Sequence, residues 1–164
     1  MTRLFSLAAL AVASALLVAA CGGSSYGGNN SPSTSTGATP GVASATPIIT
    51  AKSGSLGTFL TDAKGRTLYL WDADHGAMST CNGECAQDWP PLTTKAAPKA
   101  GAGVKASLLG TSKRSDGTKE VTYAGHPLYY YAGDTAPGQA TGQGSAAFGA
   151  PWWVVTPGGK ALQG

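Results

Sequence analysis

One short pattern occurs twice in the chain and limits its possible folds more than any other feature. Residues Tyr69 to Asp74 read Tyr-Leu-Trp-Asp-Ala-Asp, and residues Tyr129 to Asp134 read Tyr-Tyr-Tyr-Ala-Gly-Asp. Both fit the order Tyr, any residue, aromatic residue, two residues and Asp. Such repetition indicates two copies of one supersecondary unit. Each copy is too short to bury an apolar face alone, so we expect both in a single small domain.

The chain begins with a pattern typical of export. After Arg3, residues 4–20 are apolar or small except for two serines. A stretch of this length that ends in small residues predicts a secretory signal peptide over residues 1–20. The segment Val18-Ala19-Ala20-Cys21 resembles a bacterial lipobox, in which the cysteine sulfur receives a diacylglyceryl group and the cysteine becomes the new N-terminus. The alternatives are an ordinary signal peptide with an incidental cysteine, or a single anchor helix.

Lipidation at Cys21 would anchor the protein, because acyl chains bury many methylene groups in a bilayer. We therefore expect a membrane partner through Cys21, and a location on the extracytoplasmic side of the cell membrane. Residues 21–50 are mostly Gly, Ser, Thr, Asn, Ala and Pro. Such a segment buries too little surface to offset its chain entropy, so we interpret it as a flexible tether that starts at the lipidated cysteine.

The charge of the chain argues against nucleic acid as a partner. Without residues 1–20, ten Lys and Arg residues face eight Asp and Glu residues, a net charge of +2. A nucleic-acid-binding surface needs a marked basic excess. A solvated surface of mixed charge is the simpler interpretation, and we expect any further partner to be an envelope protein or a glycan.

An all-β domain is predicted over residues 51–160, because strand formers and turn residues alternate there. No stretch after residue 50 has a sustained helical period with caps, so at most a helical turn is expected in a loop. We expect two similar units that each contain a β-hairpin, repeat one over about residues 55–94 and repeat two over about 104–157. The predicted strands are residues 56–61 and 66–71 in repeat one, and 104–112 and 118–123 in repeat two.

The second predicted strand of repeat one carries two apolar faces. Leu68 and Leu70 point to one face, and Tyr69 and Trp71 point to the other, because side chains alternate along a strand. We therefore expect this strand to be covered on both sides.

The repeated pattern has a structural and a functional interpretation. In the first, aromatic rings of the two copies pack across a pseudo-twofold axis, and each Asp fixes its exit turn by accepting backbone N–H hydrogen bonds. In the second, the rings line a groove that stacks on sugars, and the carboxylates accept hydroxyl hydrogen bonds. We favour the structural one, because a repeated turn needs a fixed spacing in any case. The motif residues are Tyr69, Trp71, Asp74, Tyr129, Tyr131 and Asp134.

A cysteine pair follows the first copy of the motif. In an exported protein, Cys81 and Cys85 are expected to form a disulfide, worth about 2 kcal/mol because the ring it closes is small. The alternative is a soft-metal site for copper or a haem iron, made of His75, Met78 and the two cysteine sulfurs.

Little in the sequence favours catalysis. His75 and His126 are the only histidines, and no nucleophile or paired carboxylate accompanies them in a recognisable pattern. Neither a Gly-x-Ser-x-Gly motif nor a Walker loop is present. We expect no enzyme activity, no catalytic residue and no cofactor, and we favour a non-enzymatic binding or interaction module. The alternative is a redox or metal-handling envelope protein that uses the loop from His75 to Cys85.

The order of these motifs resembles a known family. The two motif copies, the lipobox, Cys81-Asn82-Gly83-Glu84-Cys85 and Trp89-Pro90-Pro91-Leu92 are similar to those of the bacterial secreted-repeat lipoproteins of unknown function. The resemblance covers about residues 55–157 and implies an exported, lipid-anchored, β-rich domain. In repeat two, the loop around Gly142–Gly144 has no cysteine, so the cysteine pair acts once per molecule.

Overall fold

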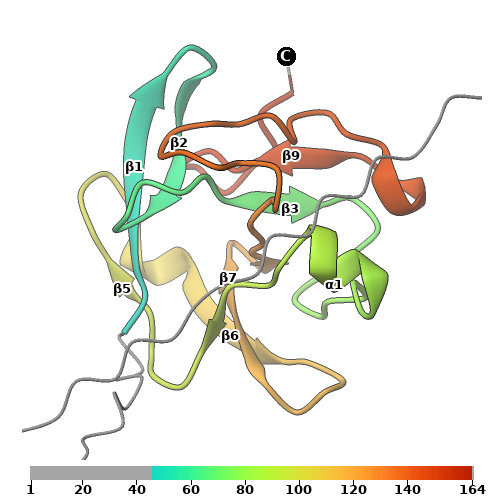
Figure 1. Cartoon of the computed structure of the whole chain (residues 1–164). Coiled ribbons are helices and arrows are strands. Elements are labelled where there is room, and N and C mark those ends of the chain that lie inside the picture. The colour runs from blue at the N-terminus through green and yellow to red at the C-terminus, as the bar shows by residue number, and fades with distance from the viewer. Residues whose placement is uncertain (1–45, 164) are drawn as a thin grey trace, which may run out of the picture. The chain divides into compact units, whose positions relative to one another are not determined.

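The structure, a computed structural model, describes residues 46–163. The predicted signal peptide, the predicted lipidation at Cys21 and most of the predicted tether lie outside these residues. Within them, the two repeats form short strands in several small sheets with one five-residue α-helix (Figure 1). The predicted all-β class is confirmed. No helix in this part of the chain has the length and apolar character needed to cross a bilayer.

Three small sheets make up the domain. The first has the strand order β2 (Gly57–Asp62), β1 (Ile48–Gly54), β5 (Lys99–Ala100). The second pairs β3 (Tyr69–Trp71) with β9 (Trp152–Val154). The third has the order β4 (Thr93–Thr94), β7 (Lys119–Tyr123), β6 (Leu109–Lys113), and β8 (His126–Pro127) also pairs with β7. Helix α1 (Glu84–Asp88) lies in the cysteine loop, and 3-10 turns cover Ala106–Leu108 and Ala147–Gly149.

The hairpin of repeat two forms as predicted, except that its first strand is shorter: β6 begins at Leu109, and Ala106–Leu108 form a 3-10 turn. The hairpin of repeat one is rearranged. Strands β6 and β7 pair around a turn in which Gly117 has a φ of 84°, a conformation that glycine adopts without steric cost. In repeat one the predicted turn after Asp62 forms, but its second arm pairs with the first only through a bridge from Thr61 to Thr67. The chain then leaves the hairpin, and β3 pairs with β9 of repeat two.

The fold extends beyond the range predicted for it. Strand β1 begins at Ile48, so three residues assigned to the tether belong to a sheet, and the β1–β2 hairpin was not predicted. Past residue 160, Ala161 forms a bridge to Val155, and the Leu162 N–H donates to the Val154 carbonyl. The connector between the repeats adds β5, which runs parallel to β1.

Each repeat ends in a segment that pairs with the other repeat. Strand β4 of repeat one pairs with β7 of repeat two, and β9 of repeat two pairs with β3 of repeat one. Two closed rings of three backbone hydrogen bonds mark this exchange, and each ring takes one residue from the other repeat's final segment. One ring joins Leu60, Leu68 and Val155, and the other joins Val121, Leu128 and Leu92.

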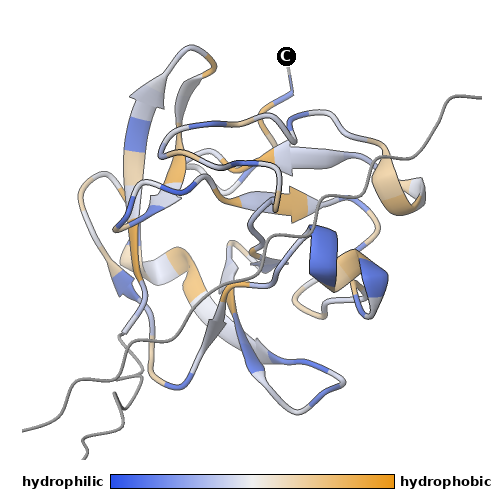
Figure 2. Ribbon diagram, in the orientation of Figure 1, coloured by the Kyte–Doolittle hydropathy of each residue, from blue (hydrophilic) through white to orange (hydrophobic). Residues whose placement is uncertain are grey.

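The core has two parts, one for each face of β3. Leu68 and Leu70 belong to a mainly aliphatic cluster, whereas Tyr69 and Trp71 belong to a mainly aromatic cluster that includes the cysteine pair. The predicted two-sided burial of this strand is confirmed, because all four side chains are 7% exposed or less. Figure 2 shows hydrophobic residues within β2 and β3 and hydrophilic residues near the tip of the β6–β7 hairpin.

Candidate functional site

The two copies of the motif meet at a pseudo-twofold axis. Tyr69 and Tyr129 lie opposite each other and exchange backbone hydrogen bonds of 2.8 and 2.9 Å. Their hydroxyls then cross between the repeats: Tyr69 donates to Asp134 and Tyr129 donates to Asp74, each at 2.6 Å. The sequence predicts that the copies pack together, but not this exchange, because spacing along the chain does not show which carboxylate each hydroxyl reaches.

Each motif carboxylate also holds the loop that follows its own copy. Asp74 Oδ1 accepts hydrogen bonds from the Thr80 backbone N–H and hydroxyl, at 2.7 and 2.9 Å. Asp134 Oδ1 accepts the equivalent pair from Thr141, at 2.8 and 2.7 Å. The predicted backbone N–H bonds to these carboxylates therefore form, although they reach six or seven residues ahead rather than the immediate turn.

The environment keeps the first tyrosine of each motif copy protonated. Burial and the adjacent Asp134 raise the pKa of Tyr69 above its ordinary value. Burial, the charge of Glu120 and the hydrogen bond to Asp74 raise the pKa of Tyr129 in the same way. Both hydroxyls therefore serve as donors, and the two carboxylates as acceptors.

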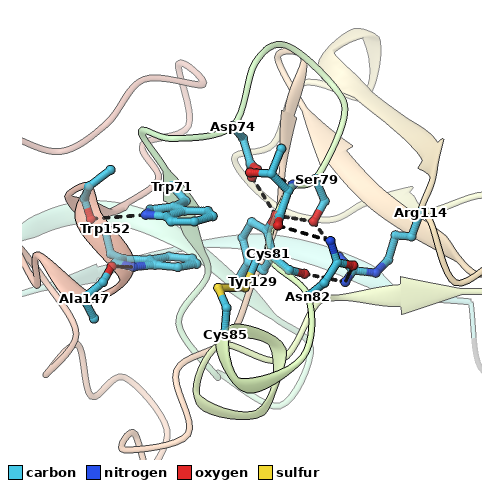
Figure 3. Close-up of a disulfide and its surroundings, with 12 residues drawn as sticks. Trp71, Asp74, Ser79, Cys81, Asn82, Cys85, Arg114, Tyr129, Ala147 and Trp152 are labelled. Carbon is cyan, nitrogen blue, oxygen red and sulfur yellow. Dashed lines mark hydrogen bonds between the residues drawn. A yellow bond between two sulfur atoms is a disulfide. The ribbon is translucent and has the colours of Figure 1, made fainter.

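Four aromatic rings stack across the same axis. Rings from the two repeats alternate in the order Trp71, Trp152, Trp89, Tyr131, with centroid separations of 4.9, 4.0 and 4.4 Å. Tyr129 meets Trp152 edge-on, as Figure 3 shows, and Tyr69 meets Trp89 edge-on. The aromatic residues of the motif therefore join the repeats to each other.

Burial rules out the sugar-stacking groove as it was predicted. Tyr69 and Tyr129 are 0% exposed and Trp71 is 7% exposed, so these rings cannot stack on a ligand. Only Tyr131 is half-buried, and with Asp134 it lines an open cavity of about 210 Å³.

The polar groups around this small cavity are already paired. The Arg66 guanidinium lies 3.7 Å from the Tyr130 ring centroid and forms a 2.8 Å ion pair with Asp62. Asp134 accepts hydrogen bonds from the hydroxyls of Tyr69 and Thr141. The cavity therefore offers few free polar groups to a ligand.

The predicted disulfide is present. Cys81 and Cys85 are bonded to each other, with their Cα atoms 5.3 Å apart, and they are 0% and 6% exposed. In this state their sulfurs supply no thiolate ligand, while His75 and Met78 are exposed at the surface. The four residues of the predicted soft-metal alternative therefore do not assemble in the oxidised protein. Among residues 46–163, no group of three or more His, Cys, Asp or Glu side chains is placed to hold a metal ion.

A buried arginine of repeat two holds the cysteine loop of repeat one. The Arg114 guanidinium donates to the Cys81 carbonyl and the Ser79 hydroxyl, both at 2.6 Å (Figure 3). It also forms a 2.7 Å ion pair with Glu120, and the two side chains are 2% and 0% exposed. Ser79 Oγ lies 2.6 Å from the Tyr129 hydroxyl, so this polar network reaches the motif.

Glu120 is the titratable group of this network with the largest consequence near neutral pH. Burial raises the pKa of its carboxyl to about 7, against the opposing effect of Arg114. Its Oε2 accepts from Arg114, and its Oε1 has no hydrogen-bond partner among the described residues. Sequence reasoning missed this pair. The available signal was Glu120, a charged residue directly before Val121 in a strand that is buried on both faces.

Comparison with known proteins identifies the repeats. The chain matches no curated protein and no solved structure. A family model described as a secreted repeat of unknown function matches twice, at residues 50–93 and 110–156, which together are more than half of the chain. Each match contains one copy of the motif, and a secreted repeat agrees with the predicted extracytoplasmic location. The chain therefore belongs to the family of secreted repeats of unknown function.

Proposed function

We propose that the protein is a lipid-anchored lipoprotein of the cell envelope, whose β domain is a non-enzymatic binding or interaction module. The observation that carries this proposal is the crossed pairing of the motif. Tyr69 and Tyr129 bond to the carboxylates of the opposite repeat, so the repeated groups build a scaffold. The outer surface of that scaffold is then free to meet a partner.

The state of the chemically capable side chains supports a role without catalysis. A general acid or base must reach the proton that it transfers. Asp74 is 8% exposed and accepts hydrogen bonds at both carboxylate oxygens. The cysteine sulfurs are joined in a buried disulfide, so they offer no nucleophilic thiolate.

The lipobox-like segment supports the anchor. Cys21 would carry the diacylglyceryl group, and the Gly- and Ser-rich residues after it would hold the domain away from the bilayer. The test compares the full-length chain with its Cys21→Ala variant by cell fractionation and intact mass. We expect the unchanged chain in the membrane fraction with the added mass of its acyl chains, and Cys21→Ala in the soluble extracytoplasmic fraction. Ser25→Ala is the matched control and should stay on the membrane. Retention of Cys21→Ala on the membrane would overturn the anchor.

The binding role has its own test. Residues 22–164, exported behind a cleavable signal peptide, are mixed with washed cell-envelope fragments and sedimented at increasing protein concentration. We expect saturable co-sedimentation and recovery of chemically unchanged fragments. The absence of saturable binding, or the release of fragment products in proportion to time, would contradict a non-enzymatic binding module.

A further inference from the structure

One open cavity lies at an end of the third sheet, away from the motif. Its volume is about 490 Å³, and its lining residues are Thr93, Thr94, Lys95, Gly117, Thr118 and Lys119. A neighbouring cavity of about 190 Å³ shares Lys95 and Lys119 and continues over residues 96–98 and Thr111. Lysine is the only charged residue type in the lining of either cavity. The two lysines that the cavities share therefore place positive charge where the cavities adjoin.

The sheet register places a third lysine beside Lys119, although this residue lines neither cavity. Lys113 on β6 lies directly opposite Lys119 on β7. Side chains opposite each other on antiparallel strands share a face and lie about 5 Å apart at Cβ, and like charges there destabilise the pair. On the other side of Lys119 lies Thr94 of β4, and Lys95 follows it in the chain. We call Lys95, Lys113 and Lys119 the lysine groove.

Nearby acids do not neutralise the lysine groove. Asp116 Oδ1 accepts hydrogen bonds from the Thr118 N–H and hydroxyl, and its Oδ2 lies 3.5 Å from Arg114 Nε. Glu120 is buried against the same arginine. Across residues 46–163, every ion pair uses Arg66 or Arg114, and no lysine takes part.

Protection of a sheet edge does not explain Lys119, although Lys113 lies on the edge strand β6 and Lys95 follows the edge strand β4. Exposed edge strands often carry lysine, which discourages pairing with other chains. At the row of Lys119, however, β7 is the central strand, with Thr94 of β4 on one side and Lys113 of β6 on the other. The repulsion between Lys119 and Lys113 therefore destabilises the sheet, and an external anion would relieve it.

We propose that the lysine groove binds an anionic polymer of the cell envelope that carries phosphate groups along an extended chain. Lysine ammonium groups bind phosphate as point charges, and threonine hydroxyls supply further donors. The three lysines come from β6, β7 and the end of β4, which spreads them over roughly 10 Å at the usual strand spacing. This spread over three strands suits repeated phosphates better than a single ion. The inference rests on the proposed binding function and names its ligand class.

The test measures binding of long-chain inorganic polyphosphate to residues 22–164 by calorimetry, with neutral dextran as the blank. The groove variant is Lys95→Gln, Lys113→Gln and Lys119→Gln together. The matched control is Lys64→Gln, Lys105→Gln and Lys160→Gln, which makes the same change in net charge outside both cavities. We expect the groove variant to lose at least tenfold in affinity and the control to lose less than threefold. We also expect polyphosphate to raise the thermal midpoint of the unchanged protein and not that of the groove variant.

Several results would overturn the inference. They are the absence of polyphosphate binding, equal losses in the two triple variants, and unchanged binding by the groove variant. A lipid surface is the other source of phosphate, so vesicles of phosphatidylcholine with 30% phosphatidylglycerol form a second arm. Binding to vesicles but not to polyphosphate, lost in the groove variant, would assign the groove to the membrane and reject the polymer. Failure in either arm is distinct from failure of the envelope sedimentation test, which does not depend on these lysines alone.

Discussion

At the level of single residues, the equivalent Asp and Tyr side chains of the two motif copies have different environments. Asp74 is buried, and the hydroxyl of its partner Tyr129 also meets Ser79. Asp134 is half-buried, and among the described residues the hydroxyl of its partner Tyr69 has one further hydrogen bond, from the Gly142 N–H at 3.4 Å. The loss of a hydrogen bond to a carboxylate costs more free energy where water cannot replace the donor. The two crossed pairs should therefore contribute unequally to stability.

Removing each hydroxyl tests this inequality. We expect Tyr129→Phe to lower the free energy of unfolding by about 1.5–3 kcal/mol, the range for hydrogen bonds to charged groups, and Tyr69→Phe to lower it by less. Urea unfolding followed by tryptophan fluorescence measures both. Tyr131→Phe is the control, because its hydroxyl has no hydrogen bond among the described residues. Equal losses for all three variants would show that the crossed pairs contribute nothing specific.

Glu120 predicts how stability depends on pH. Burial raises its pKa from 4.5 to about 7 in the folded protein, so between these values the folded state binds more protons than the unfolded state. The free energy of unfolding from this group is therefore highest below pH 4.5 and falls as the pH rises towards 7, by at most about 1.4 kcal/mol per pH unit.

The Glu120→Gln variant isolates that contribution, because it removes this carboxyl and no other. We expect urea unfolding at pH 5, 6 and 7 to show the decline in the unchanged protein and a flatter profile in Glu120→Gln. Glu84→Gln makes the same chemical change at an exposed site and should keep the original slope. Parallel profiles for all three proteins would show that Glu120 does not titrate in this window.

At the scale of elements, the cysteine loop is held by a strand of the other repeat. Arg114 connects the Cys81 carbonyl and Ser79 to Glu120, and all of its partners in that network are buried or half-buried. A buried ion pair stabilises a protein little more than a pair of apolar side chains in its place. Removal of one member alone, however, leaves an uncompensated buried charge. The contribution of Arg114 should therefore be large when it is removed alone.

We expect Arg114→Met to lower the free energy of unfolding by about 3–5 kcal/mol at pH 8, where Glu120 is ionised. Arg66→Met is the matched control, because its ion pair with Asp62 is half exposed on the arginine side and should cost about 1 kcal/mol or less. Guanidinium chloride unfolding measures both. Similar losses in the two variants would mean that burial of the Arg114 pair has no energetic consequence.

These elements also show what the sequence could predict. The β6–β7 hairpin was predictable because its Asp-Gly turn is local, and the disulfide because two cysteines lie close together in an exported chain. The pairing of β3 with β9 was not, since their residues are about 80 apart and nothing local selects the partner. Strand β1 was not recognised because only its first two residues, Ile48 and Ile49, are large and apolar, and the residues after them are small or polar. Sequence pattern likewise showed that the motif copies meet, but not that their hydroxyls cross or that Arg114 reaches the cysteine loop.

At the scale of the whole molecule, the exchange of final strands makes the two repeats interdependent. Each ring of three backbone hydrogen bonds takes two residues from one repeat and one from the other, as with Leu60, Leu68 and Val155. A single repeat would keep the bond between Leu68 and Leu60 but leave the Leu60 N–H and the Leu68 carbonyl without their partner in an apolar region, which is costly. It would also lose half of the four-ring stack that crosses the axis. The two family matches in this chain therefore describe one folding unit.

Separated repeats test this interdependence. We expect fragments 46–103 and 104–164 each to be unfolded alone, without the near-ultraviolet circular dichroism that packed tryptophans produce, because each lacks the segment that completes its ring. Mixed in equal amounts, with the disulfide of the first formed, they should associate and recover that signal, since both final segments are then present. The recovery should depend on concentration, because the fragments no longer share a chain. A cooperative unfolding transition in either fragment alone would show that one repeat is sufficient for a fold, and that the exchanged strands only join two units that were already stable.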